Sequence, residues 1–161
     1  MPDERASSDE TLYRAFAIFN EIGIVSQLGR TIFEARLPPG VLLPHFTLIN
    51  HLVRVRDGQT PLAMARAFQL PKTTVSHMVS VVARHGWVTL RPNPEDGRSK
   101  RVWLTESGRA FRERAIRAVA PDLAEISAAL GDTAQDDLLR QLTALRVYLD
   151  ARRDDPNGSS G

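Results

Sequence analysis

The longest stretch of helical periodicity lies near the N-terminus of the chain. Ser7 can cap a helix, and Glu10 three residues later can complete a capping box. The apolar spacing continues to Leu37, where the breaker Pro38-Pro39-Gly40 ends it, so we predict a helix over residues 8–37. Its apolar positions extend well beyond one stripe, which is typical of a helix buried on more than one side. In a small protein, a second subunit can supply one of those neighbours.

Three shorter helices are predicted next. Apolar spacing and breakers place them over residues 44–55, 61–68 and 71–85. Pro61 and Pro71 mark two of the starts, because proline fits the first turn of a helix and not its interior. The third helix should bury one face, which carries the i, i+3, i+4, i+7 pattern of Val75, Met78, Val79 and Val82.

After Gly86 the periodicity changes from helical to strand-like. Residues 87–91 and 101–105 are rich in β-branched and aromatic side chains. The residues between them combine Pro, Asn, Asp and Gly with several cations. The pattern therefore predicts a β-hairpin with a long, basic tip.

Two more helices are predicted on the C-terminal side. Thr105-Glu106-Ser107 can cap a helix that continues to Gly131, and Pro121 should kink that helix or divide it into two pieces. A final helix begins near Asp132 and carries a heptad-like seam, too short to establish a coiled coil, made of Leu138, Leu142, Leu145 and Leu149. The polar, breaker-rich residues 154–161 are expected to be disordered.

These elements give the expected fold class, which is mainly α with a small β-hairpin. A length of 161 residues and a mass of 17.9 kDa fit one compact core with appended helices. We divide the chain into an N-terminal helix, a central lobe that includes the hairpin, a C-terminal helical segment and a tail, over residues 8–37, 44–105, 106–153 and 154–161.

Composition excludes several classes of protein. The chain has no cysteine, which excludes disulfides, thiolate metal sites and thiol-based redox sensing. No apolar run approaches the ~18 residues of a membrane span, and the polar, acidic start is unlike a secretion signal, so we expect a cytoplasmic protein. Motifs of hydrolases, zinc proteases and nucleotide-binding enzymes are missing from the sequence. We therefore expect no enzymatic activity and no cofactor.

The distribution of charge says more about partners than its sum of +2. Residues 71–104 hold six cations and two anions, so this segment carries +4 and the remainder −2. Short hydroxyl and basic side chains at the start of the predicted helix 71–85 suit the major groove of duplex DNA. A basic hairpin directly after such a helix is typical of a winged helix. A polar helix face can equally be only solvated, and Asp96-Gly97-Arg98 can be an ordinary charged turn.

Residues 73–90, followed by DGRSKRVWLTESG at 96–108, resemble the MarR family of bacterial transcription regulators. The wing of that family has the form D-x-R, a short spacer, then V-x-L-T-x-x-G, and the order of elements agrees over residues 10–150. The resemblance implies a homodimer, joined by its terminal helices, that binds a pseudo-palindromic operator with winged helix-turn-helix lobes, as a repressor or less often an activator. It also implies that Arg98 reaches the minor groove with Asp96 as its partner. The candidate DNA-binding residues are Lys72, Thr73, Thr74, Ser76, His77, Arg84, Asp96, Arg98, Lys100 and Arg101.

The same resemblance suggests a small-molecule effector. Many members of the family are released from DNA by a small, often aromatic acid, which lies between the dimerisation helices and the DNA-binding lobe. Arg54 or Arg14 is available to an anion, and the candidate lining residues are Phe16, Phe19, His45, Phe46 and His51. Aromatic residues at helical spacing are more often simply part of a core. Thiol-based sensing is excluded here, and four scattered histidines argue against a zinc site.

A second interpretation is a helical protein–protein interaction module that uses the leucine seam of residues 138–149. It accounts for the leucines and leaves the basic wing unexplained.

Overall fold

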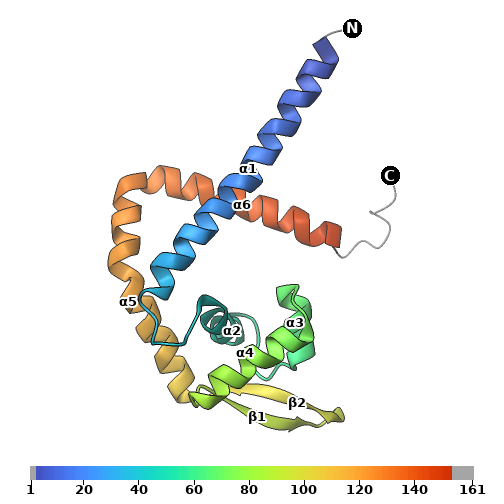
Figure 1. Ribbon diagram of the computed structural model, residues 1–161, viewed down its shortest axis with the longest axis vertical. Coiled ribbons are helices and arrows are strands. Elements are labelled where there is room, and N and C mark those ends of the chain that lie inside the picture. The colour runs from blue at the N-terminus through green and yellow to red at the C-terminus, as the bar shows by residue number, and fades with distance from the viewer. Residues whose placement is uncertain (1–2, 154–161) are drawn as a thin grey trace. The chain divides into compact units, whose positions relative to one another are not determined.

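The computed structural model describes residues 3–153, with side chains from residue 9 to residue 152. This part of the chain contains six helices and one two-stranded antiparallel sheet (Figure 1), which confirms the predicted fold class. The chain forms two compact units that divide after Val119. In chain order the elements are α1 (Asp3–Glu34), α2 (Leu43–Arg54), α3 (Pro61–Phe68), α4 (Lys72–Arg84), β1 (Val88–Asn93), β2 (Asp96–Leu104), α5 (Glu106–Leu130) and α6 (Asp132–Arg153).

The core of the first unit lies where α2, α3 and α4 meet the hairpin of β1 and β2. Figure 1 shows α4 above the hairpin, with α2 and α3 alongside. The predicted apolar face of α4 is confirmed, because Val75, Met78, Val79 and Val82 are all buried. Burial of each such side chain stabilises the fold by about 1.5–3 kcal/mol. The other almost completely buried side chains of this core are Leu48, Ile49, Leu52, Met64 and Val102.

The short helices begin and end close to their predicted bounds. α3 starts at Pro61, and Thr60 Oγ1 accepts a hydrogen bond from the backbone N–H of Ala63 at 3.2 Å. α2 and α4 each differ from prediction by one residue at either end. Local capping and proline signals therefore locate the helices of the central lobe.

The N-terminal helix begins earlier than predicted. α1 starts at Asp3, so the capping box predicted at Ser7 and Glu10 is wrong, and Ser7 lies inside the helix. Residues 3–8 contain no helix breaker, and acidic residues near a helix start are favoured by the helix dipole. The helix ends at Glu34, and a turn leads on to the prolines that were expected to stop it.

The hairpin has longer strands and a shorter tip than predicted. Pairing is regular as far as Pro92 and Lys100, then jumps to Asn93 and Asp96. The expected long basic loop is therefore wrong, since most of it belongs to the two strands. An edge strand tolerates Pro92, because its outer side needs no hydrogen-bond donor. The jump leaves residues 97–99 as a β-bulge on β2 with no paired residue on β1.

The loop between α2 and α3 is tied to the base of the hairpin. Asp57 Oδ1 accepts hydrogen bonds from the backbone N–H groups of Gly58 and Leu104, both at 2.9 Å. Gly58 has a φ of 69°, and a Cβ there would lie 2.6 Å from the ring of Trp103. Glycine is therefore required at this position by both backbone conformation and space.

The start of α5 is capped by Thr105, as predicted. Its Oγ1 accepts a hydrogen bond from the N–H of Gly108 at 3.0 Å and donates one to the carbonyl of Gly86 at 2.7 Å. The helix continues through Pro121 to Leu130, so the predicted alternative of two separate helices is wrong. Proline removes one backbone donor from the helix, and the division between the two compact units falls close to this point.

The long helices leave large apolar side chains exposed. On α1, Leu12, Tyr13, Phe16 and Val25 are between 64% and 72% exposed. The predicted leucine seam lies on α6, where Leu138, Leu142 and Leu149 are also exposed. Apolar patches of this kind mark interaction surfaces.

No helix in the described part of the chain is long and apolar enough to span a membrane. The predicted tail, residues 154–161, lies outside the described residues.

Candidate nucleic-acid interface

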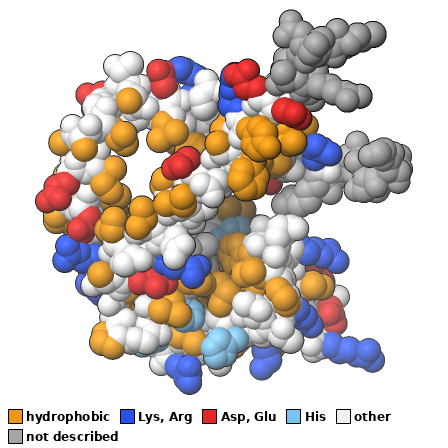
Figure 2. Space-filling view, turned by 45° about the horizontal axis from the view of Figure 1, so that its top comes forward, with side chains coloured by type: hydrophobic (Ala, Val, Ile, Leu, Met, Phe, Trp, Pro, Cys, Tyr) orange, Lys and Arg blue, Asp and Glu red, His pale blue; other side chains and the backbone are white. Residues whose placement is uncertain are grey.

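A groove of about 460 Å³ lies between α4, the start of α3 and the hairpin, which we call the wing (residues 88–104). It brings together five of the predicted DNA-binding residues from two separate elements, α4 and β2. Lys and Arg side chains are spread along the lower edge of the molecule in Figure 2, where α4 and the hairpin lie. The groove is lined by Thr60, Pro61, Leu62, Lys72, Ser76, Asn93, Asp96, Arg98, Ser99 and Lys100.

The polar face of α4 is directed away from the core. All five candidates at its start are exposed, while the apolar positions between them are buried. Lys72 and Ser76 line the groove, whereas Thr73, Thr74 and His77 are exposed on the helix outside that lining. This alternation follows from the helical period, which turns consecutive residues by about 100°.

Arg84, at the far end of α4, lines an adjoining hollow of about 480 Å³. Ser76 and Lys100 line both hollows, so the two form one surface along α4 and the wing. Arg84 and Lys100 are exposed. The surface therefore presents four cations from this chain, namely Lys72, Arg84, Arg98 and Lys100.

Asp96 contacts the backbone of Arg98 and not its side chain. Asp96 Oδ1 accepts a hydrogen bond from the backbone N–H of Arg98 at 3.0 Å. Among the described residues, the guanidinium group of Arg98 forms no ion pair. The carboxylate therefore holds the backbone of the β-bulge and leaves the arginine side chain available to a ligand.

Arg101 has a different environment from the other predicted cations. Its side chain is only 17% exposed. Nε donates a hydrogen bond to Asn93 Oδ1 at 2.9 Å, and the guanidinium group also lies 2.9 Å from Glu95 Oε2. Arg101 is thus bound within the wing.

Several residues of this surface carry no recognisable signal in the sequence. Asn93 and Ser99 lay in a segment expected to be a loop, and nothing in the sequence marked their side chains as partners. Thr60 caps α3 and also lines the groove. The closeness of α3 to the wing is a tertiary feature, so only the three-dimensional structure reveals this third wall of the groove.

The five candidate effector residues lie in three different environments. His45 and Phe46 are buried in α2, and His45 Nδ1 accepts a hydrogen bond from the N–H of Leu42 at 2.9 Å. His51 Nε2 contacts the side-chain amide of Gln59 at 3.1 Å. Phe16 and Phe19 are exposed on α1. His45 therefore serves as a cap at the start of its own helix.

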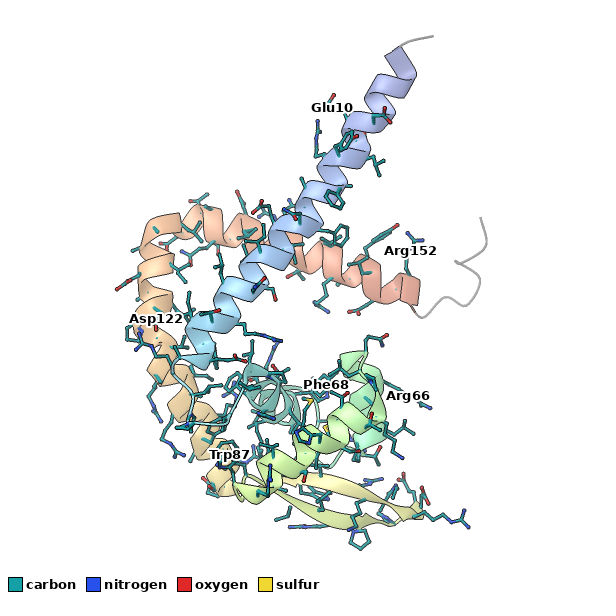
Figure 3. All side chains as sticks on the ribbon, viewed as in Figure 1. Glu10, Arg66, Phe68, Trp87, Asp122 and Arg152 are labelled. Carbon is teal, nitrogen blue, oxygen red and sulfur yellow. The ribbon has the colours of Figure 1, made fainter. Side chains whose placement is uncertain are left out.

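A different cavity, of about 350 Å³, has both aromatic and cationic walls. The rings of Trp87 and Phe111 stack there, with centroids 3.7 Å apart. Trp87, labelled in Figure 3, lies where α4 ends and the hairpin begins. Two arginines, Arg36 and Arg114, contribute to the lining. The other lining residues are Leu37, Pro38, Ala115 and Ala118.

The proton affinity of His45 is shifted by its surroundings. Burial lowers the pKa of His45 below its usual value, and the positive charges that His77 and His85 can carry lower it further. The Glu34 carboxylate acts in the opposite direction and raises it. Among the side chains that the structure describes, no group of three or more His, Asp or Glu is arranged to hold a metal ion.

Comparison with known proteins gives a consistent result. A sequence model of the MarR family matches residues 40–99. No curated protein matches the chain. A MarR-family transcription regulator of known structure is 23% identical and superimposes with a TM-score of 0.70, covering 93% of this chain and 99% of that chain.

Two further structures were solved with bound molecules. A mutant MarR from E. coli in complex with operator DNA is 22% identical, with a TM-score of 0.69, and covers 82% of this chain and 95% of that chain. The PcaV transcriptional regulator from Streptomyces coelicolor, in complex with its natural ligand, is 21% identical, with a TM-score of 0.62, and covers 76% of this chain and 89% of that chain. At these identities the likeness establishes a shared fold.

Proposed function

Because residues 40–99 match a sequence model of the MarR family, we propose that the protein is a homodimeric, sequence-specific transcription regulator of this family. It binds a pseudo-palindromic DNA operator and acts as a repressor in the cytoplasm. The proposal involves no catalytic step, metal or cofactor.

The groove between α4 and the wing is the observation that carries this proposal. Lys72, Arg98 and Lys100 line it together with the hydroxyl of Ser76. The α4 helix can enter the major groove with its exposed face toward the base edges, while the bulge of the wing reaches the adjacent minor groove. Negative potential is concentrated in a narrow minor groove, which favours an arginine such as Arg98 there.

The exposed apolar side chains of α1 and α6 support a dimer. A 32-residue helix with Leu12, Phe16 and Val25 exposed needs a partner surface, and a second copy of the chain supplies an identical one. Two copies place two recognition helices about one DNA turn (~34 Å) apart, which matches a pseudo-palindrome.

Selection of duplexes from a random-sequence library, followed by mobility-shift titration, tests DNA binding. If each subunit neutralises about four phosphates, the logarithm of the affinity should fall with the logarithm of salt concentration with a slope of about −7. Enrichment of a pseudo-palindrome would support the proposal. Absence of binding to any selected duplex at low salt would overturn it.

We also propose that a small aromatic carboxylate binds in the cavity of Trp87 and Phe111 and weakens DNA binding. The stacked rings offer an apolar wall and Arg114 a cation. Benzoate serves as the probe, and it should raise the melting temperature of the protein. Arg114→Ala should weaken benzoate binding roughly tenfold. Arg117→Ala, on the same helix but outside the lining, is the matched control, and equal losses in both variants would contradict this site.

The alternative function, an interaction module that uses the leucine seam of α6, is favoured by the exposure of Leu138, Leu142 and Leu149. It predicts that the protein binds no DNA in the selection experiment. Failure of that selection, combined with a monomeric protein in solution, would favour this alternative.

A further inference from the structure

We propose that Asn93 is a positioning residue, which locks the β-bulge of residues 97–99 and thereby fixes Arg98 for contact with DNA. The inference rests on the proposed function, because it assigns Asn93 a part in DNA binding. It goes beyond that function because it assigns the two arginines of the wing different roles. Arg98 contacts DNA, and Arg101 holds the wing together.

Asn93 is a buried polar residue next to the exposed residues 94–98 of the tip. It is only 7% exposed, and it lies at the point where the register of the two strands jumps. Its amide nitrogen donates a hydrogen bond to Ser99 Oγ at 2.9 Å. Its amide oxygen accepts from Arg101 Nε at 2.9 Å and from the N–H of Glu95 at 3.2 Å. One side chain thus joins both strands and the turn between them.

The hydrogen bonds continue from Asn93 into the bulge. Ser99 Oγ accepts from Asn93 and donates its own proton to the carbonyl of Asp96 at 3.1 Å. The carboxylate of Asp96 accepts the N–H of Arg98 at 3.0 Å. The residues on both sides of Arg98 are therefore held. A bulge without these bonds would have to become ordered when DNA binds, and that ordering would weaken binding.

Arg101 completes the lock from the second strand. Its guanidinium group binds Asn93 and also lies 2.9 Å from the carboxylate of Glu95, which is 78% exposed. This ion pair neutralises the carboxylate of Glu95, which would otherwise repel the phosphate backbone of DNA. Arg98, in contrast, is exposed and shares the groove lining with Lys72 and Lys100. The structure thus gives two arginines three positions apart opposite roles.

A double-mutant cycle with Arg98 tests the proposal on the full chain. The probe is a labelled duplex recovered by selection from a random-sequence library. Asn93→Ala should weaken binding about tenfold, comparable to the loss of one wing contact. In an Arg98→Ala background the same substitution should change affinity less than about twofold, because no arginine remains to be positioned. A merely structural role would weaken binding equally in both backgrounds.

Two further variants keep the test decisive. Asn50→Ala is the matched control, since Asn50 accepts a hydrogen bond from Arg112 Nε at the same 2.9 Å but away from the wing. It should leave DNA affinity unchanged. Ser99→Ala breaks the connection to the bulge without removing a buried amide, so it should reproduce the loss if Asn93→Ala fails to fold.

The outcomes distinguish this inference from the proposed function. If the wild-type protein binds no selected duplex, the proposed function fails. If the wild-type protein binds and Arg98→Ala weakens binding, but Asn93→Ala and Ser99→Ala bind like wild type, the positioning role alone is overturned. Additive losses in the cycle would also overturn it.

Discussion

The side chain of His45 caps the start of α2. Its ring nitrogen Nδ1 accepts the N–H of Leu42, which would otherwise lack a partner at the start of α2. The neighbouring N–H of Leu43 is accepted by Glu34 from α1 at 2.7 Å. The start of α2 is therefore capped from its own first turn and from the preceding helix, and this capping depends on a neutral imidazole.

The stability of the protein should depend on the charge of His45. Burial lowers the pKa of His45 in the folded state, and His77 and His85 lower it further, while Glu34 acts in the opposite direction. As the pH falls, the unfolded state therefore binds the proton at a higher pH than the folded state does. The stability that neutral His45 contributes is fully present above its ordinary pKa of about 6.5 and is lost as the pH falls through the lowered pKa of the folded state. The difference in unfolding free energy between wild type and His45→Gln should narrow from pH 8 to pH 5. Denaturant titrations that give a constant difference would refute this.

Gly58→Ala should be strongly destabilising. The residue has a positive φ, and the new Cβ would meet the ring of Trp103. We expect a loss of about 2–4 kcal/mol in chemical denaturation, from backbone strain and overpacking together. Gly40→Ala is the matched control, because Gly40 has a φ of 78° with open space around its Cβ position. It should show only the backbone cost of about 1–2 kcal/mol, and equal losses would exclude the steric role of Trp103.

At the scale of elements, the wing is a hairpin with two different parts. Its base is joined to the loop before α3 through Asp57, and Thr105 bonds to Gly86 across the two chain segments that flank the wing. Its tip is held by the hydrogen bonds of Asn93. The base of the wing is therefore held by the rest of the lobe, and its tip is held by its own hydrogen bonds. Its exposed cations are already in place before DNA binds, so no ordering of the wing opposes binding.

Lys100 and Arg101 should differ in how their removal affects salt dependence. Lys100 is exposed on the groove, so Lys100→Ala should make the slope of log affinity against log salt less negative by about 2 for a dimer. Arg101 is occupied by Asn93 and Glu95, so Arg101→Ala should weaken binding while leaving the slope nearly unchanged. Mobility-shift titrations at several salt concentrations measure both. An equal change of slope would mean that Arg101 contacts phosphate.

A row of aromatic rings connects several elements of the first unit. Phe33 of α1 lies 4.6 Å from Phe46 of α2, which lies 6.4 Å from Phe111 of α5. Phe111 stacks on Trp87, and Trp87 stacks on His85 at the end of α4, with centroids 4.3 Å apart. A ligand in the proposed effector cavity would contact this row directly, because Trp87 and Phe111 line the cavity.

At the scale of the whole molecule, the proposed dimer accounts for surface that a single chain leaves unprotected. Hydrophobic burial is the main favourable contribution to most protein association. The exposed apolar side chains of α1 and α6 belong to long helices outside the winged-helix core. Dimerisation and the folding of the central lobe should therefore be separable by mutation.

The substitution Phe16→Glu should prevent dimerisation without preventing the folding of the central lobe. Phe16 is 69% exposed in the single chain, so the charge should disrupt the dimer without unfolding the lobe. Analytical ultracentrifugation at micromolar concentration should show a shift toward the 17.9 kDa monomer, and the salt slope for DNA should fall to about half. Arg14→Ala, which removes only an exposed ion pair with Glu10, is the control. A variant that remains dimeric would place Phe16 outside the interface.

Local signals in the sequence were enough to predict the order and type of the elements and the segment that carries the excess positive charge. The cap at Thr105, the prolines at helix starts and the apolar period of α4 act over a few residues, so they can be recognised from the sequence alone. The same local signals failed at Ser7, where a cap was available but no breaker forced the helix to start there, and in the wing, where turn residues were accommodated within strands.

The contacts that each charged or polar side chain makes depend on how the chain folds. The sequence gives no reason to assign Arg98 and Arg101 different roles. In the folded chain Arg101 is bound by Asn93 and Glu95, whereas Arg98 is exposed. The α3 wall of the groove, the capping role of His45 and the cavity beside Trp87 likewise arise from elements that meet only after folding. Burial and hydrogen bonding depend on such distant neighbours, as with Arg112 and Asn50, which lie 62 positions apart.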